Sequence, residues 1–220
     1  MRVLVVGASG GIGAALVQAA AARGNTVQGL SRRVDGLDVT DEASVAKHLG
    51  ALQGAFDVVI AATGALEIGA QGPEKSLRAL DPAVMAAQFA LNTIGPALVL
   101  KHATRLLPRD RRAVFVALSA RVGSIGDNRA GGWYSYRAAK AALNQIIRTG
   151  AIELARSHSQ LACVALHPGT VTTPLTAKYL GHHVAVTPDE AAQNLWSVID
   201  GLSARDTGRF LDWAGKEIVW

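Results

Sequence analysis

The sequence has few of the residues that define disulfide-rich or metal-rich proteins. It contains a single cysteine, Cys163, among 220 residues, so a disulfide framework and a cysteine-based metal site are both excluded. Aromatic residues make up only 5% of the chain, whereas half of its residues are hydrophobic. We therefore expect a core of alanine, valine and leucine, with Cys163 buried in a strand over residues 161–166.

The chain also lacks a run of eighteen unbroken apolar residues, so we expect no membrane-spanning segment and no membrane partner. Residues 1–22 resemble a signal peptide in their apolar and alanine content, but glycines interrupt them and a helical stripe of apolar residues follows. We expect a cytoplasmic protein. The net charge is +5, but the densest basic group, Arg105–Arg112, fits a solvated helix end, so no nucleic-acid partner is expected.

Short β-rich runs alternate with longer helical stretches along the chain. The expected strands are residues 2–6, 25–30, 56–63, 113–118 and 161–166, and the expected helices are 12–23, 41–50, 82–106, 134–157 and 188–201. Asp81-Pro82 and Thr187–Glu190 carry the signals of a helix start. The alternation predicts one α/β domain, residues 1–220, with a Rossmann-like, doubly wound parallel sheet in three layers.

The stretch between the end of the second expected strand and Asp38-Val39 is unusually short. Only seven residues separate Leu30 from Asp38-Val39. A crossover between two parallel strands needs about ten residues or more, so a crossover helix cannot fit there. Either a small helix has been dropped, or the strand at Asp38-Val39 is vestigial.

The first expected strand runs directly into spaced glycines. Gly7, Gly11 and Gly13 form a G-x-x-x-G-x-G pattern that opens a helix. Backbone N–H groups and the positive end of the helix dipole favour a phosphate there, and glycine allows its close approach. The stricter G-x-G-x-x-G pattern does not match. We interpret this turn, with Ser9 and Ile12, as a dinucleotide site; a glycine turn that binds nothing is the alternative.

A second motif overlaps the same turn. Gly7–Gly11 also reads G-x-S-x-G, the nucleophile elbow of α/β-hydrolases, with Ser9 as the nucleophile. That elbow takes oxyanion donors from an earlier strand and loop, and we find no strand ahead of residues 2–6. A serine hydrolase is therefore the less favoured reading.

The end of the second expected strand indicates which dinucleotide would bind. A free ribose 2′-hydroxyl is usually met there by an acidic residue, but this chain has Ser31, Arg32 and Arg33. A hydroxyl and two guanidinium groups suit a 2′-phosphate through charge-assisted hydrogen bonds. We expect NADP(H) rather than NAD(H), although arginines after a strand can also be merely solvated.

Tyr136 and Lys140 are four residues apart in an expected helix and share one face. A phenol is a poor acid or base at neutral pH, and a neighbouring ammonium lowers its pKa. Such a tyrosine can pass a proton to or from a carbonyl or alcohol oxygen. Alone, Y-x-x-x-K is a weak signal because chance produces it in many helices.

Together and in this order, the motifs resemble the short-chain dehydrogenase/reductase family over nearly the whole chain. The resemblance implies adenine contacts at Asp38 and Val39 and a nicotinamide-contacting loop over Pro168–Thr173. Trp133–Arg137 and Gly208–Trp213 resemble the C-factor-like branch of the family. The cofactor residues implied after the later strands are Ala62, Thr63, Gly64, Asn92, Tyr136, Lys140, Pro168, Gly169, Val171 and Thr173.

The resemblance also implies catalytic roles. Tyr136 is the general acid–base, Lys140 lowers its pKa and bonds the nicotinamide ribose, and Asn92 holds a proton-relay water. A serine orients the substrate carbonyl, with Ser119 the best candidate and Ser124 a weaker one. Counting back from Gly123 puts Ala120 in the serine's place, in which case another group orients the carbonyl and the chain is slow or inactive.

The sequence thus predicts an NADP(H)-dependent oxidoreductase that moves a hydride between nicotinamide and a carbonyl or alcohol carbon of a small molecule. A non-catalytic NADP-binding signalling protein is the alternative. The resemblance implies a homodimer or homotetramer formed through residues 82–106 and 134–157. Pro174–Val186 is expected to form a short lid, and His182-His183 fits a loop better than a zinc site, so no metal is expected.

Overall fold

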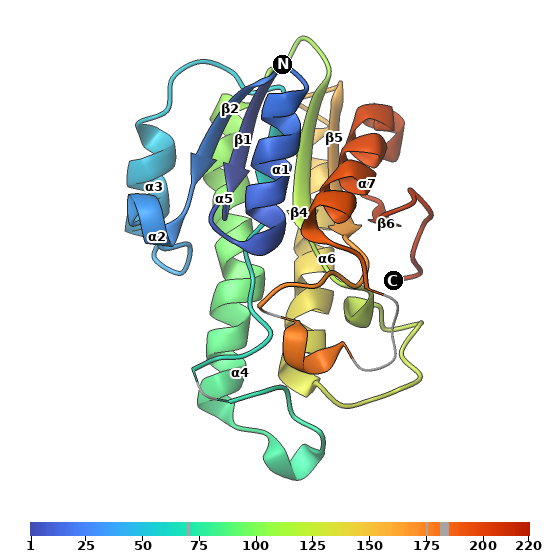
Figure 1. Cartoon of the computed structure of the whole chain (residues 1–220). Coiled ribbons are helices and arrows are strands. Elements are labelled where there is room, and N and C mark those ends of the chain that lie inside the picture. Colours follow the sequence, from blue (N-terminus) through green and yellow to red (C-terminus); the bar gives the residue numbers. More distant parts are fainter. Residues whose placement is uncertain (70, 175, 181–184) are drawn as a thin grey trace.

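The computed structural model describes residues 1–69, 71–174, 176–180 and 185–220. A parallel sheet of six strands runs through the middle of the molecule (Figure 1). Its order is β2-β1-β3-β4-β5-β6, and every neighbouring pair is parallel. The strands are β1 Arg2–Val6, β2 Thr26–Leu30, β3 Val58–Ala61, β4 Ala113–Leu118, β5 Leu161–His167 and β6 Phe210–Asp212.

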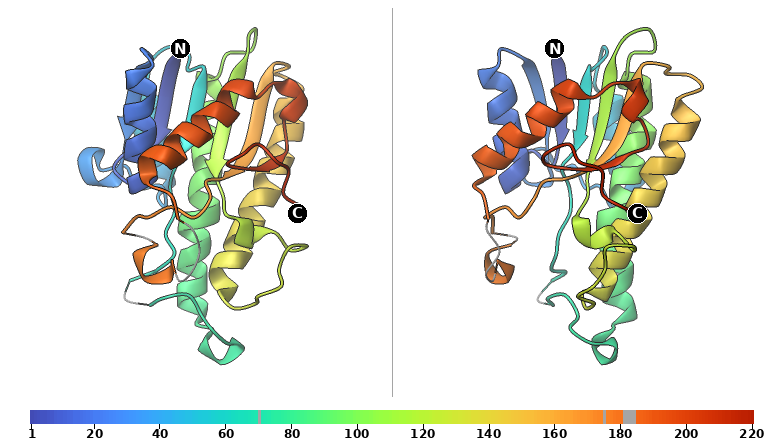
Figure 2. Two further views of the ribbon diagram at one scale, coloured as in Figure 1. Left: turned by 45° about the vertical axis from the view of Figure 1, so that its right-hand side comes forward. Right: turned by 90° about the vertical axis from the view of Figure 1, so that its right-hand side faces the viewer.

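Helices cover both faces of the sheet, as the two turned views show (Figure 2). Helices α1 and α7 pack on one face, and α3, α5 and α6 pack on the other. The bounds are α1 Gly11–Ala22, α2 Arg32–Asp35, α3 Glu42–Gly50, α4 Pro82–Phe89, α5 Gly95–Ala103, α6 Tyr134–Leu154 and α7 Pro188–Gly201. Successive residues of the central strands point into the two cores alternately, and both sets are fully buried. The predicted Rossmann-like, three-layer fold is confirmed.

The short gap after β2 is resolved in favour of a vestigial strand. Residues 32–35 form the single-turn helix α2, which Ser31 caps by accepting a hydrogen bond from the Val34 backbone at 3.3 Å. Asp38-Val39 lies in no strand, so β2 is the edge of the sheet. At the opposite edge, β6 is a strand that the sequence did not predict, because it has only three residues and no alternating pattern.

The expected helix 82–106 is interrupted in the middle. A π-helical turn, Ala90–Ile94, separates α4 from α5, and a 3₁₀ turn, Thr104–Leu106, ends the segment. Pro96 has no N–H to donate to the carbonyl of Asn92 four residues earlier, which explains why the regular ladder breaks there. By length and composition this segment could cross a membrane; in the structure it packs against α3 and α6 as part of the helical layer.

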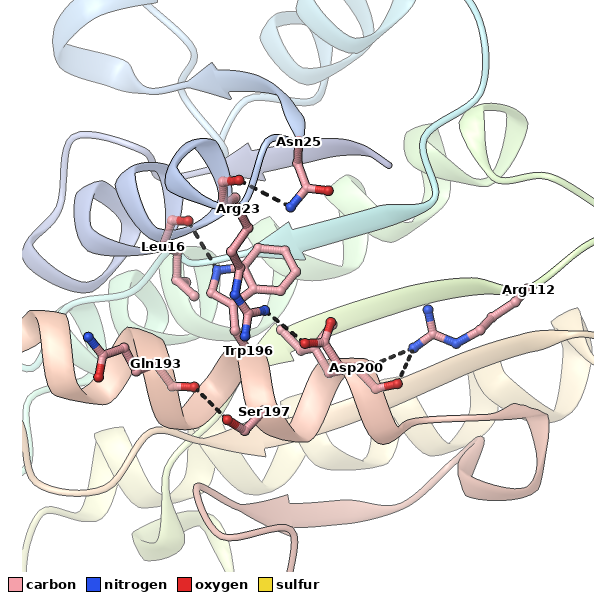
Figure 3. Close-up of polar contacts among 10 residues, drawn as sticks. Leu16, Arg23, Asn25, Arg112, Gln193, Trp196, Ser197 and Asp200 are labelled. Carbon is pink, nitrogen blue, oxygen red and sulfur yellow. Dashed lines mark hydrogen bonds and ion pairs between the residues drawn. The ribbon is translucent and has the colours of Figure 1, made fainter.

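The helix α7 holds α1 in place on the other face (Figure 3). The fully buried Trp196 indole donates a hydrogen bond to the carbonyl of Leu16 at 3.2 Å. Arg23 stacks over the same indole, 5.6 Å from its centroid, and pairs with Asp200 at 2.8 Å. Arg112 donates to the carbonyl of Ile199 near the end of α7. This packing fixes α1, and with it the glycine turn at its start.

Candidate active site

One cavity of about 810 Å³ opens at the carboxyl ends of β1, β3, β4 and β5. Ligands of open α/β sheets bind at the carboxyl ends of the strands, because the connecting loops diverge there. The cavity is lined by segments from the glycine turn, from the loops after the strands and from the start of α6, within residues 9–13, 62–66, 118–122, 133–140, 167–174 and 176–180. The predicted glycine turn and the predicted Tyr136–Lys140 pair therefore share one cavity.

The glycine turn is closed by contacts that leave no room for a side chain. Gly7 has a φ of +96°, and a Cβ on it would lie 2.5 Å from the carbonyl oxygen of Ala62. A Cβ on Gly13 would lie 2.1 Å from the carbonyl oxygen of Gly7, and one on Gly11 would lie 2.9 Å from Thr173. Gly10 is the N-cap residue of α1 and provides no side-chain cap. The first residues of α1, Gly11–Gly13, line the cavity, and the N-terminus of a helix favours an anion.

The loop after β3 adds a second feature that fits a dinucleotide. Ala62, Thr63 and Gly64 line the cavity. The Thr63 hydroxyl is buried and has no hydrogen-bond partner among the described residues. An unpaired buried hydroxyl is unfavourable by about 1–3 kcal/mol, so a polar ligand group at this wall would remove a penalty. The glycine turn and Thr63 together fit the predicted cofactor.

Tyr136 lies in the first turn of α6, and Lys140 lies one turn further on. The Lys140 ammonium is buried, donates to the carbonyl of Leu118 at 2.9 Å and lies 5.9 Å from the Tyr136 ring centroid. Burial raises the pKa of Tyr136 to about 12 and lowers the pKa of Lys140 to about 8. The expected lowering of the tyrosine pKa is therefore not found in this structure, because burial of the phenol outweighs an ammonium that is directed to the end of β4.

Asn92 is fully buried in the π-helical turn, where its amide holds the loop after β3. Its Nδ2 donates to the Ala65 carbonyl at 2.9 Å and to the Gln88 side chain at 2.5 Å, and its Oδ1 accepts from the Ala65 backbone at 3.2 Å. A Cβ on Gly64 would lie 2.7 Å from Asn92 Oδ1 and 3.3 Å from Lys140 Nζ. Asn92 thus borders Lys140 across Gly64 rather than forming part of the cavity wall.

The three candidates for the carbonyl-orienting position differ sharply. Ser119 borders the cavity, but its buried hydroxyl donates to Asn144 Oδ1 on α6 at 2.6 Å. Ala120 borders the cavity with a methyl group. Ser124 donates to the carbonyl of Val219 and accepts from the Asp127 backbone, so it braces the C-terminal segment. Of the two serines, only Ser119 is placed to reach a substrate. To donate to that substrate, its hydroxyl must first give up the hydrogen bond to Asn144.

The loop after β5 returns to the glycine turn. Gly169 has a φ of +81° and packs against Trp213, Val171 bridges to Val186, and Thr173 contacts Gly11. Pro168, Gly169, Val171 and Thr173 all line the cavity, where the resemblance placed nicotinamide contacts. The predicted lid contains the 3₁₀ turn Ala177–Tyr179. Residues 175 and 181–184, with His182-His183, lie outside the described part of the chain.

The predicted adenosine-end residues lie beside the glycine turn rather than on the cavity wall. The Gly7 and Ala8 backbones donate to the carbonyl of Leu30 at 2.8 and 3.1 Å, which brings the end of β2 against the turn. Arg32 and Arg33 are exposed at that point. The buried Ser31 hydroxyl instead serves α2, since it accepts from Val34 and donates to Asp35.

Asp38 forms a local turn in the same region. Its carboxylate accepts from the Thr40 hydroxyl at 2.7 Å and from the Thr40 backbone at 2.9 Å, and these bonds lower the pKa of Asp38. Val39 is buried against Gly95. Among the described residues, no three His, Cys, Asp or Glu side chains gather as a metal site.

Several cavity residues were not among the predicted site residues. His167, at the end of β5, lines the cavity, and burial followed by the charge of Arg121 lowers its pKa to about 4. Trp133 packs edge-on against Tyr136 and Tyr179, with centroids 6.4 and 5.7 Å apart. The Tyr179 hydroxyl donates to Glu67 at 2.6 Å. Strand-end position and aromatic character alone did not distinguish these residues from packing residues.

Comparison with known proteins gives the class of this site. Residues 1–182 match the short chain dehydrogenase family. The chain is 34% identical over 188 residues, 84% of its length and 79% of the relative's, to 1-hydroxy-2-glutathionyl-2-methyl-3-butene dehydrogenase of Rhodococcus sp. (strain AD45). It is 33% identical over 155 residues, 69% of its length and 88% of the relative's, to C-signal of Myxococcus xanthus.

Solved structures agree in fold. A carbonyl reductase from chicken fatty liver, bound to NADPH, superposes with a TM-score of 0.83 at 25% identity, over 100% of this chain and 94% of that one. The carbonyl reductase Sniffer of D. melanogaster has a TM-score of 0.81 at 20% identity, covering 100% and 99% of the two chains. The fold and the cavity thus define a Rossmann-type oxidoreductase. The chain belongs to the short-chain dehydrogenase/reductase family, an enzyme family, and its relatives support the C-factor-like branch.

The contact between Gly13 and Gly7 yields a prediction. Gly13→Ala should abolish NADPH binding, because the new methyl would lie 2.1 Å from the Gly7 carbonyl and force the turn open. Gly50→Ala is the control, since a Cβ there meets nothing within 4 Å. Binding is measured by quenching of tryptophan fluorescence, and folding by thermal melting. A folded Gly13→Ala protein with unchanged NADPH affinity would contradict this account of the turn.

Proposed function

We propose that this protein is an NADP(H)-dependent oxidoreductase that transfers a hydride between nicotinamide and a carbonyl or alcohol carbon. The main support is that Tyr136, the buried Lys140 and a glycine turn at a helix start border the same cavity. Neither group is useful alone, because the pair needs a hydride source and the turn needs a reacting centre.

The cofactor fits the residues that border this edge of the sheet. Gly11 and Gly13 would hold the pyrophosphate at the N-terminus of α1. Arg32 and Arg33 are exposed beside the turn and could pair with a 2′-phosphate, which favours NADP(H) over NAD(H). The NADPH-bound carbonyl reductase that superposes on this chain supports the same choice.

The proposed mechanism divides the work between cofactor and protein. When bound, the cofactor supplies or accepts the hydride. Tyr136 donates its phenolic proton to the carbonyl oxygen during reduction and takes it back during oxidation. With its pKa at about 12, Tyr136 keeps that proton at neutral pH, which suits the reducing direction. Lys140, with a pKa of about 8, supplies positive charge beneath the ring and stabilises the phenolate as it forms.

Carbonyl orientation is assigned to Ser119. Its hydroxyl must rotate away from Asn144, where it now donates, to donate to the substrate instead. Ala120 contributes only a methyl group. The substrate is proposed to be a small molecule with an apolar body, because Leu66, Val122 and Trp133 form much of the remaining wall.

A non-catalytic NADP(H)-binding signalling protein is the second, less favoured candidate function. The carbonyl-orienting position is either Ala120 or Ser119, and the Ser119 hydroxyl already donates to Asn144. In addition, one relative is named C-signal. A protein that binds NADP(H) and signals without turnover would fit both facts. The Tyr136–Lys140 pair argues for the enzyme, because a binding protein has no need for an acid–base pair at the cavity.

The remaining proposals concern the state of the protein in the cell. We propose that the protein forms a homodimer or homotetramer through residues 82–106 and α6, because Ile94, Ile146 and Ile152 are exposed on these segments. We also propose that the protein is cytoplasmic and has no nucleic-acid or membrane partner.

The acid–base role of Tyr136 is tested by Tyr136→Phe. We expect kcat for aldehyde or ketone reduction to fall by about 100-fold or more, because the proton donor is gone, while NADPH affinity stays within twofold. Tyr134→Phe is the control, since that residue lies in the same helical turn outside the cavity lining. Turnover is followed by NADPH absorbance. NADPH binding without any turnover in the unaltered protein would support the signalling protein instead.

The cofactor preference is tested by replacing Arg32 and Arg33 with alanine. The double variant should lose at least tenfold in affinity for NADPH and little for NADH, because only NADPH carries the 2′-phosphate. Arg156→Ala, an exposed arginine on another part of the surface, should change neither. Equal losses for both cofactors, or no loss for NADPH, would exclude this role for the two arginines.

A further inference from the structure

The helix that carries Tyr136 begins without a cap of its own. Its N-cap position is Trp133, whose side chain accepts no hydrogen bond from the first turn. Trp133 is also the one non-glycine residue in the described chain with a positive φ, +54°, and it follows Gly131 and Gly132 at +62° and +65°. Residues 134–137 include no acid. A helix start of this kind leaves N–H groups in need of a partner.

Glu74 provides that partner from a distant part of the chain. Its carboxylate accepts from the Ser135 backbone at 3.2 Å and also from the Ser135 hydroxyl. Its own carbonyl accepts from the Trp133 backbone at 2.5 Å. Glu74 stands in the loop between β3 and α4, 61 residues before Ser135.

The burial of this side chain indicates that the contact is a specific one. Glu74 is only 7% exposed, and a buried carboxylate is unfavourable unless it is hydrogen-bonded or paired. Here it meets N–H and O–H donors at the positive end of a helix of 21 residues, where negative charge is favoured. A surface glutamate that touched α6 by chance would keep its carboxylate in water.

The two residues that Glu74 holds are the ones that place the aromatic groups of the cavity. Ser135 directly precedes Tyr136, so its backbone position determines where the phenol projects. Trp133 presents its indole edge to Tyr136 and Tyr179, and its left-handed backbone is held by the bond to the Glu74 carbonyl. The loop after β3 therefore determines the geometry of the first turn of α6.

We propose that Glu74 is a positioning residue for the reaction: it caps α6 from outside the helix and so holds Tyr136 and Trp133 in place against the cavity. This inference rests on the proposed function of Tyr136. It adds a residue that contacts neither cofactor nor substrate, because Glu74 is outside the cavity lining.

The activity test compares two replacements of Glu74. Glu74→Ala removes the acceptor, and we expect kcat for aldehyde reduction to fall at least tenfold while NADPH affinity stays within twofold. Glu74→Gln keeps an amide oxygen that can accept from the Ser135 backbone, so we expect it to restore kcat to within about threefold of the unaltered enzyme. Failure of the glutamine to restore activity, or an unchanged kcat in Glu74→Ala, would overturn the proposal.

A matched control separates positioning from general loss of stability. Asp81 caps α4 through its carboxylate, which accepts from the Ala83 and Val84 backbones at 2.8 and 3.2 Å. Asp81→Ala removes a helix cap of the same kind and should lower the melting temperature, yet leave kcat within twofold. If Asp81→Ala lowers kcat as much as Glu74→Ala does, the effect is general destabilisation and the proposal is wrong.

A second readout does not depend on turnover. Amide hydrogen exchange over residues 134–140 should be faster in Glu74→Ala than in the unaltered protein, and unchanged in Asp81→Ala. Faster exchange with no catalytic activity in any form would support the cap and reject the proposed function. Unchanged exchange would reject the cap itself.

Discussion

The contact on which the site depends is the hydrogen bond from the buried Lys140 ammonium to the carbonyl of Leu118. It joins α6 to the end of β4, so that the helix carrying Tyr136 is tied to the edge of the sheet where the glycine turn also lies. A buried ammonium is tolerated only with such a partner, and its depressed pKa of about 8 reflects the remaining cost. Lys140 thereby has a structural role besides its proposed chemical one.

The fold was largely predictable because its signals are local. Each of the five predicted strands is present with shifts of a few residues at its ends, since buried parallel strands are continuous apolar runs. The strand β6 was missed because three residues carry no pattern, and the π-helical turn was missed because its cause, Pro96, acts on a carbonyl four residues away.

The site was predictable as a set of motifs but not as a set of contacts. Gly11, Gly13, Tyr136 and Lys140 line one cavity, as the order of the motifs implied. The sequence could not indicate that Ser119 donates to Asn144, or that Glu74 reaches α6, because both pairings join residues far apart in the chain. The direction of the Tyr136 pKa was also wrong, since spacing reveals the nearby ammonium but not the depth of burial.

The central claim is that NADPH binds with its pyrophosphate on the glycine turn and its nicotinamide ring facing the Tyr136 phenol. A crystal structure of the protein with NADPH tests it most directly. We predict the pyrophosphate against the N–H groups of Gly11–Gly13 and the nicotinamide C4 in the cavity, with room for a carbonyl oxygen about 3 Å from the Tyr136 hydroxyl. NADPH bound elsewhere, or a nicotinamide ring remote from Tyr136, would contradict it.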